Sequence, residues 1–312
     1  LKLSQTLRKR RFKNGSVNFN IPEPRIHLDK KGCVDRITVA EHNAAHELVE
    51  EFMLAANQEV AKHLFEKEIP SIHRIHEPPD EDKLALFNDF IDAFGLHLPS
   101  PRKVKSSSLQ KLLDKVHGRP EERTVNALLL RTMKKAIYSE KDPGHYCLGF
   151  EHYTHFTSPI RRFPDLITHG TVKNFLKKKK IALREKKRLR PRIVEYAEQS
   201  TQMEIKAMGI EREVNDLRRA QYMADKIGSA YSGIITGVTS FGFFVELAEV
   251  FVEGLVHIRD LADDYYIYFE HEHMLKGQRH RRKYKIGGAV EVRLKHVDIS
   301  KRQIDLTVIP SR

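Results

Sequence analysis

The sequence predicts an α+β protein, with a helix-rich portion over residues 1–226 and a small β-barrel over residues 227–309. The first observation is the spacing of apolar residues from Ala45 to Val60, which has the 3.6-residue period of an amphipathic helix. The second is a change near Ile227 to short β-branched runs with glycines at their bends, which favours a small barrel. A chain of 312 residues is long enough to form two domains with separate cores.

The helix-rich portion is expected to alternate helices with short extended segments. A basic helical stretch comes first, then an alternating run from Val17 to Ile21 that predicts a strand, and then a strand or hairpin arm over residues 25–39. Further helices follow from apolar spacing and from residues that can cap or stop a helix. They are expected at residues 45–60, at 81–94, between a capping serine triplet at 106–108 and Gly118, at 121–138 and at 166–176, with a turn at 142–144.

Basic residues strongly exceed acidic ones, giving a formal net charge of +13 and a pI near 9.6. No apolar run approaches the roughly 18 residues of a membrane helix, and the start does not resemble a secretory signal. Nucleic acid is therefore favoured over a membrane surface as the anionic partner. Residues 177–192 contain ten lysines and arginines against one glutamate, which predicts a solvated, mobile segment with salt-sensitive attraction to phosphates. A long charged helix is expected after it, at residues 193–222.

Cys33 and Cys147 lack the paired spacing of a zinc site or a disulfide framework, which fits a reducing cytoplasm. The first residue, Leu1, is not a methionine and lies in a stretch with a helical pattern. We therefore expect the chain to be part of a longer protein.

The segment from His155 to Leu166 is the densest in chemically useful residues. Prolines at 159 and 164 restrict the backbone on both sides of Arg161 and Arg162. Planar guanidinium groups bind phosphate oxygens through paired hydrogen bonds, and the hydroxyls of Thr157 and Ser158 can donate to the same anion. The segment therefore predicts a phosphate clamp, and the alternative is a loop whose arginines pair with local carboxylates such as Asp165.

The barrel is expected to carry aromatic rings on its surface. Its strands are expected at residues 232–238, 241–247, 254–257, 289–296 and 303–309, with an insertion at 263–284 that is longer than a minimal barrel needs. Phe241 and Phe244 flank a Gly-Phe pair, and a glycine bend or bulge can leave both rings facing solvent. Exposed rings there would stack on bases without sequence preference, whereas the alternative is that they belong to the core.

The run from Tyr153 to Leu166 closely resembles the signature of the RNB exoribonucleases, the family of RNase II and RNase R. Further matches, in the right order, lie at residues 50–57, 74–76 and 129–138, and the similarity is strongest to the RNase R branch. The barrel resembles an S1 RNA-binding domain of the OB type. The resemblance implies the C-terminal part of an RNB catalytic domain over residues 1–226, followed by an S1 domain over residues 227–309. It also implies processive 3′-to-5′ hydrolysis of RNA to nucleoside 5′-monophosphates.

The same resemblance assigns roles to particular residues. It implies that Arg161 lies at the scissile phosphate and that an acidic residue of the helix around residues 45–60 approaches the RNA 3′ end. Either Glu50 or Glu51 can match that acidic residue. On the S1 domain, the positions implied to contact RNA are Phe241, Phe244, His257, Asp298 and Arg302.

RNB enzymes use Mg²⁺ held by closely spaced aspartates, because the metal stabilises charge on phosphate oxygens and activates water. The pairs Asp80/Asp82 and Asp263/Asp264 do not resemble that motif, so we expect no metal ligands in this chain. The isolated chain is therefore expected to bind single-stranded RNA without hydrolysing it. The implied partners also include structured RNA and ribosome-associated factors, with no membrane, and the chain is expected to be monomeric.

Two alternatives remain open. One is a noncatalytic RNA-binding or RNA-chaperone protein that has lost the metal site, and coding sequence upstream of Leu1 would distinguish it from the enzyme. The other is a basic ribosome-associated structural protein, which explains the charge but not the segment around Arg161.

Overall fold

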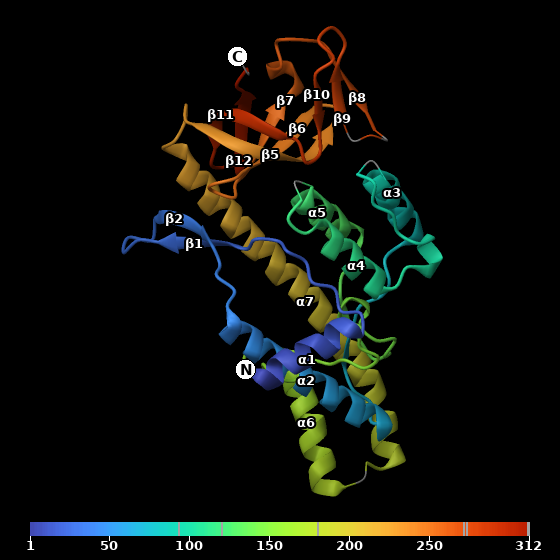
Figure 1. Cartoon of the computed structure of the whole chain (residues 1–312). Helices are drawn as coiled ribbons and strands as arrows, with labels where there is room; N and C mark the ends of the chain where they lie inside the picture. Colours follow the sequence, from blue (N-terminus) through green and yellow to red (C-terminus); the bar gives the residue numbers. More distant parts are fainter. Residues whose placement is uncertain (93, 120, 180, 271, 273, 311–312) are drawn as a thin grey trace. The chain divides into compact units, whose positions relative to one another are not determined.

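The computed structural model describes residues 1–92, 94–119, 121–179, 181–270, 272 and 274–310 (Figure 1). It divides into two compact units, each built from separate parts of the chain. The first contains residues 1–20 and 42–207, and the second contains residues 21–41 and 208–312. The expected α+β class is confirmed, because a helix-rich part is followed by a closed barrel.

The first unit is mainly helical. Its elements are α1 (Lys2–Lys13), α2 (Ala44–Glu66), β3 (His73–Ile75), α3 (Glu81–Asp92), η1 (Pro101–Lys103), α4 (Ser106–Val116), α5 (Glu122–Thr132), β4 (Ile137–Ser139), η2 (Tyr146–Leu148), α6 (Phe163–Lys178) and the part of α7 (Leu183–Ala224) before residue 208. Helices α3, α4 and α5 share one apolar core, in which Ile91, Leu109 and Leu129 are fully buried. The predicted helix at residues 45–60 is confirmed as α2, which begins where the Asn43 side chain accepts the N–H of Ala45.

The strand predicted from Val17 to Ile21 is wrong. This segment forms no strand and pairs with no other strand among the described residues. Its backbone donors bond to distant residues instead: the N–H of Val17 donates to the carbonyl oxygen of Cys147 at 2.8 Å, that of Asn18 to Gln110 Oε1 at 2.7 Å and that of Asn20 to Asn126 Oδ1 at 3.0 Å. The following hairpin is confirmed as β1 (Pro24–Leu28) paired with β2 (Val34–Val39) in the second unit.

Three helix boundaries also differ from the prediction. α5 ends at Thr132 rather than near Tyr138, because residues 137–139 leave the helical path and pair with β3 as strand β4. The serine triplet does not cap α4. The serines form its first turn, and the N-cap residue is Lys105, whose side chain makes no capping hydrogen bond. The long helix expected at residues 193–222 begins earlier, since α7 starts at Leu183 and continues through Pro191, so most of the basic run is helical.

The barrel in the second unit consists of β5 (Ala230–Thr239), β6 (Gly242–Leu247), β7 (Glu253–His257), β11 (Ala289–Asp298) and β12 (Gln303–Val308), with η3 (Ile258–Asp260) after β7. β5, β6 and β7 form an antiparallel meander, β12 lies parallel to β7, and β11 closes the barrel against β5. Phe243, Val245 and Leu306 fill the interior. The predicted strands are therefore confirmed, with small differences at their ends.

The insertion forms a small antiparallel sheet of its own. Its strands are β8 (Tyr266–Phe269), β9 (Met274–Gly277) and β10 (Lys283–Lys285), in the order β10-β9-β8. No helix in the described part of the chain is both long and apolar enough to cross a bilayer.

Candidate nucleic-acid interface

The loop from Tyr153 to Arg162 is fixed at its start by one buried asparagine of α2. Asn57 Oδ1 accepts the N–H groups of Phe156 at 3.0 Å and Thr157 at 3.2 Å. Asn57 Nδ2 donates to Tyr153 Oη at 3.1 Å, and Asn57 itself is 2% exposed. An amide in this position satisfies two successive backbone donors, so it holds the loop in one conformation. The sequence analysis did not identify Asn57, although an asparagine on the apolar face of a predicted helix is a signal that could have found it.

The end of the loop is fixed by a buried carboxylate in the first turn of α6. Asp165 is fully buried, and its Oδ1 accepts the N–H of Ser158 at 2.8 Å and Arg162 Nη2 at 2.8 Å. The carbonyl of Ser158 accepts the N–H groups of Arg161 at 3.3 Å and Arg162 at 3.1 Å, which forms a tight turn. Pairing with Asp165, the alternative considered for both arginines, therefore occurs for Arg162.

Arg161 has different surroundings. It is exposed at the tip of this turn beside the fully exposed Ile160. No carboxylate among the described residues pairs with its guanidinium group. The Thr157 hydroxyl is buried and has no hydrogen-bond partner within the described structure. The loop thus presents one uncommitted cation and one uncommitted hydroxyl, both able to donate to an anion.

Aromatic and imidazole rings pack behind the loop. Tyr138 Oη and His155 Nδ1 lie 2.8 Å apart, and the Arg74 guanidinium group lies 4.6 Å from the centre of the Tyr138 ring. Arg74 is held by Glu204 of α7 through contacts of 2.6 and 3.1 Å. Burial, and then the positive charges of Arg162 and Arg74, lower the pKa of His155 to about 2. The ring is therefore neutral at physiological pH, and its surroundings favour anions.

Three further histidines of this unit are held neutral. Burial lowers the pKa of His145 to about 3, and burial also lowers the pKa values of His73 and His76. His76 Nε2 lies 2.7 Å from the carbonyl oxygen of Lys134, and its Nδ1 accepts the N–H of Cys147 at 3.2 Å. These rings contribute to the packing behind the loop and do not supply positive charge.

Acidic pH should destabilise the protein through these histidines. An unfolded histidine has a higher pKa than these buried ones, so the unfolded state binds more protons and stability falls as the pH drops below about 6.5. We expect His145 and His155 each to remove ~2 kcal/mol of unfolding free energy between pH 7 and 5, measured by urea unfolding. His155→Gln should reduce this pH dependence, and a slope equal to that of the unaltered protein would contradict the assignment.

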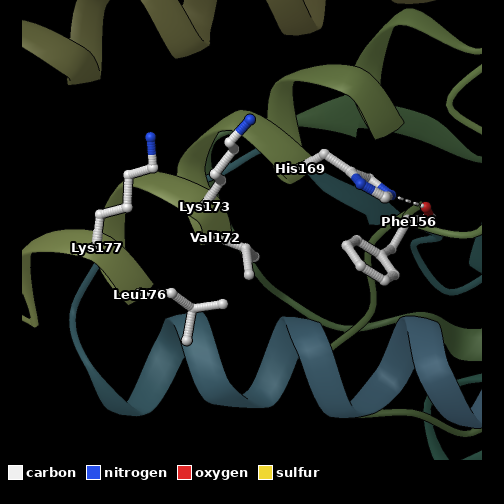
Figure 2. Close-up of a pocket in the computed structure, with 6 residues that line it drawn as sticks. All are labelled: Phe156, His169, Val172, Lys173, Leu176 and Lys177. Carbon is white, nitrogen blue, oxygen red and sulfur yellow. Dashed lines mark hydrogen bonds between the residues drawn. The ribbon is translucent and has the colours of Figure 1, made fainter.

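An open groove lies beside the loop along α6 (Figure 2). Its residues recur on one face of the helix, at positions 169, 172, 173, 176 and 177, and Phe156 lines it from the loop. The rings of Phe156 and His169 stack at 4.1 Å, and His169 Nε2 lies 2.8 Å from the Phe156 carbonyl oxygen. Figure 2 shows the side chains of Lys173 and Lys177 extending to the same side of the helix. The groove therefore adds two cations close in sequence to the loop.

The structure separates the roles of the two glutamates of α2. Glu51 is 2% exposed and accepts Arg11 Nη2 at 2.5 Å and Arg11 Nε at 3.1 Å. Glu50 is exposed and lies 2.9 Å from His42 Nε2. Glu51 is thus committed to an internal ion pair, and Glu50 is the one that remains accessible.

On the barrel, Phe241 and Phe244 both reach the surface, and Phe243 belongs to the core. Phe241 is 46% exposed, and its ring meets that of Phe244 edge to face at 6.3 Å. Gly242 has φ +153°, and a Cβ there would collide with the carbonyl oxygen of Val256, so glycine is needed at this bend. The pairing of Gly242 with His257 brings that imidazole to the same region. His257 Nδ1 accepts the N–H of Arg259 at 3.1 Å.

Asp298 and Arg302 lie elsewhere on the barrel: Asp298 is the last residue of β11, and Arg302 lies in the turn to β12. Asp298 Oδ1 accepts a hydrogen bond from the Ser300 hydroxyl at 2.6 Å and one from the N–H of Lys301 at 3.0 Å. These bonds, that of Ser300 most strongly, lower the pKa of the Asp298 carboxyl group. Arg302 has φ +58° and lies 3.5 Å from Glu213 of α7. β12 runs parallel to β7, so this turn lies at the Glu253 end of β7, away from His257.

The described residues contain no cluster of histidine, cysteine, aspartate or glutamate that could hold a metal ion. Asp80 is used at the start of α3, where its Oδ1 accepts the N–H of Asp82 at 3.1 Å. Asp264 accepts backbone N–H groups within the insertion, from Tyr265 at 2.7 Å and from His280 at 2.7 Å. The residues described here therefore do not fit the magnesium site that the resemblance implies.

Comparison with known proteins identifies two conserved domain types. The RNB domain family matches residues 1–178, and the S1 RNA binding domain family matches residues 224–309. Ribonuclease R of Aquifex aeolicus is 38% identical over 307 residues, which cover 98% of this chain and 43% of that protein. Ribonuclease R of Escherichia coli is 33% identical over 322 residues, which cover 99% of this chain and 39% of that protein. The chain thus spans about two fifths of the length of these relatives.

Solved structures agree with this similarity. The apo form of Mycoplasma genitalium RNase R superposes with a TM-score of 0.93 at 30% identity, covering 98% of this chain and 48% of that one. Its complex with ribose methylated single-stranded RNA also superposes with a TM-score of 0.93, at 31% identity and with the same coverage. The chain therefore belongs to the RNB family, in its ribonuclease R branch.

Proposed function

We propose that this chain forms the RNA-holding half of a processive 3′-to-5′ exoribonuclease that releases nucleoside 5′-monophosphates. The observation that carries the proposal is Arg161, an uncommitted guanidinium group on a turn fixed by Asn57 and Asp165, within the residues that match the RNB domain. The RNase R of Mycoplasma genitalium, similar over nearly the whole of this chain, has been solved with single-stranded and with double-stranded RNA. These complexes support RNA as the substrate.

In the proposed mechanism, Arg161 donates two hydrogen bonds to nonbridging oxygens of the scissile phosphate. Charge grows on these oxygens as the phosphodiester is attacked, so a preorganised planar cation stabilises the transition state more than the ground state. The Thr157 hydroxyl, buried without a partner, and the backbone around Ser158 complete the anion site. Arg162 contributes mainly by holding the turn through Asp165, with a secondary electrostatic effect on the phosphate.

The other assignments belong to the same proposal. Residues 1–226 act as the C-terminal part of the catalytic domain and residues 227–309 as the S1 domain, with the insertion at 263–284. Mg²⁺ is the cofactor that the family resemblance implies, and we assign none of the described residues to it, since they contain no cluster that could hold a metal ion. The protein acts as a cytoplasmic monomer on single-stranded and structured RNA. Glu50 rather than Glu51 approaches the RNA 3′ end, because Glu51 is occupied by Arg11. The proposed RNA contacts on the S1 domain are Phe241, Phe244, His257, Asp298 and Arg302.

The test is incubation of the purified chain with a 5′-labelled single-stranded RNA, with Mg²⁺ or with chelator, beside a binding titration at two salt concentrations. We expect binding without shortening, and a binding constant that falls steeply with salt because cations displace counterions from the phosphates. Chelator-sensitive shortening from the 3′ end would show that carboxylates of this chain assemble a metal site. Absence of RNA binding at low salt would overturn the proposal.

Phe241→Ala should weaken the binding of long single-stranded RNA by about fivefold or more, since one stacked base contributes ~1–3 kcal/mol. Binding of short oligomers should change little. Fluorescence anisotropy with labelled RNAs of both lengths measures the difference. Ile227→Ala, which removes another exposed apolar side chain of this unit, is the control. A loss confined to the short oligomers would contradict the stacking role.

A further inference from the structure

The insertion sheet has one face packed on the barrel. Tyr284 of β10 stacks on the core residue Phe243 at 4.6 Å, and Tyr266 of β8 lies 5.4 Å from Tyr284. Leu275 of β9 is paired with Tyr284 and is fully buried. Because alternate residues of a strand face opposite sides, the residues between these three belong to the opposite face. The sheet is thus firmly anchored, and on its other face Met274 is buried while the side chains along β8 are exposed.

The outward face carries large apolar side chains along β8 and the residue before it. Tyr265 is 70% exposed, Ile267 is 39% exposed and Phe269 is 37% exposed. Their positions are two residues apart, so they form a row with a spacing of about 6.6 Å. Exposed apolar side chains are common singly, but a row with two aromatic rings on one sheet face marks an interaction surface.

Two lysines extend across the sheet from the middle of the apolar row. Lys276 of β9 is directly opposite Ile267, and Lys283 of β10 is directly opposite Lys276. The Lys276 ammonium group is 5.9 Å from the centre of the Phe269 ring. Residues 276–285 contain six lysines and arginines and no acidic residue. Acidic residues lie at both ends of the apolar row: Asp263 and Asp264 precede Tyr265, and Glu270 and Glu272 follow Phe269 in the loop to β9. The two lysines lie between these ends, opposite Ile267.

The basic turn between β9 and β10 is held in place by one carboxylate. Asp264 accepts the N–H groups of Arg279 at 2.9 Å and His280 at 2.7 Å, and also that of Tyr265 at 2.7 Å. The N–H of Gln278 donates to the carbonyl oxygen of Tyr265 at 3.0 Å. These bonds fix the basic turn next to the exposed Tyr265 ring. The charged segment is therefore part of an ordered surface rather than a solvated tail.

We propose that this outward face is a second binding surface for single-stranded nucleic acid, separate from the one proposed around Phe241. Bases stack on Tyr265 and Phe269 and contact Ile267, and the phosphates contact Lys276 and Lys283. Exposed rings with cations next to them on the same face suit a single strand, which has an apolar face on each base and one charge per nucleotide. An uncharged apolar protein surface would leave the two lysines without counter-charges. The inference rests on the proposed RNA-binding function and extends it to a site on the insertion.

The test uses the absence of tryptophan from this chain. In Tyr265→Trp, the single indole reports stacking directly, because bases quench its fluorescence. Titration with a single-stranded 20-nucleotide RNA should give strong, saturable quenching. Phe241→Trp reports on the surface already proposed, and Leu28→Trp, at an exposed position of β1, reports nonspecific quenching. Each variant retains an apolar side chain at an exposed site, so the fold should persist, and circular dichroism checks that it does.

Each outcome decides the question. Quenching at Tyr265→Trp that exceeds the Leu28→Trp background, and that Lys276→Gln/Lys283→Gln weakens by about fivefold or more, supports the second surface. Lys30→Gln/Lys31→Gln removes the same charge from the turn between β1 and β2 and should have a much smaller effect. Quenching at Phe241→Trp but not at Tyr265→Trp overturns the inference and leaves the proposed function standing. Quenching at neither position overturns both, and quenching of Tyr265→Trp by duplex RNA alone also overturns the inference.

Discussion

Arg161→Lys should lower the rate constant of RNA cleavage by about 100-fold or more, while the dissociation constant for RNA changes by less than about tenfold. Lysine keeps the positive charge, so the general attraction to the phosphate backbone remains. It lacks the planar fork of donors, however, and cannot form two hydrogen bonds to the oxygens on which charge develops. The measurement is single-turnover cleavage and equilibrium binding, in a form of the protein that degrades RNA.

The same substitution at an exposed arginine of the first unit provides the control. Arg10 lies exposed on α1, and Arg10→Lys should change neither cleavage nor binding appreciably. If Arg161→Lys lowers binding and cleavage by the same factor, Arg161 only anchors the RNA backbone. If it changes neither, the uncommitted guanidinium group is a surface feature and the proposed mechanism is wrong.

Local patterns predicted the elements whose hydrogen bonds are local. α2 follows from its apolar period and β5 to β7 follow from β-branched runs bounded by glycine, because a helix bonds within itself and a meander pairs neighbouring strands. The strand predicted from Val17 to Ile21 was wrong because the hydrogen bonds of this segment are not local. Two of its backbone donors, those of Asn18 and Asn20, bond to side chains about a hundred residues away, on α4 and α5, which no local pattern reveals.

The candidate site shows the same division. The clustering of Thr157, Ser158, Arg161 and Arg162 was visible from the sequence, but the difference between the two arginines was not. The difference depends on Asp165, which is fully buried in the fold and pairs with Arg162. The choice between the two glutamates of α2 likewise depends on a distant partner, the arginine of α1 that binds only one of them.

Asp165→Ala should destabilise the first unit by about 3–5 kcal/mol, because it leaves the Arg162 guanidinium group partly buried without its counter-charge. It also removes the acceptor of the Ser158 N–H, which is a second, smaller cost. Urea unfolding followed by circular dichroism gives the change in free energy. Asp165→Asn keeps an acceptor for the Ser158 N–H but not the charge, so it should lower the free energy of unfolding by less than Asp165→Ala does.

The double variant Asp165→Ala/Arg162→Met separates the charge from the rest of the effect. Removing both partners eliminates the uncompensated cation, and a methionine fills much of the arginine volume, so most of the stability should return. The remaining loss then measures the Ser158 acceptor alone. If Asp165→Ala instead leaves stability unchanged and strengthens RNA binding, Arg162 is free to bind phosphate in solution. Both arginines would then form the clamp, and the division of roles between Arg161 and Arg162 would be wrong.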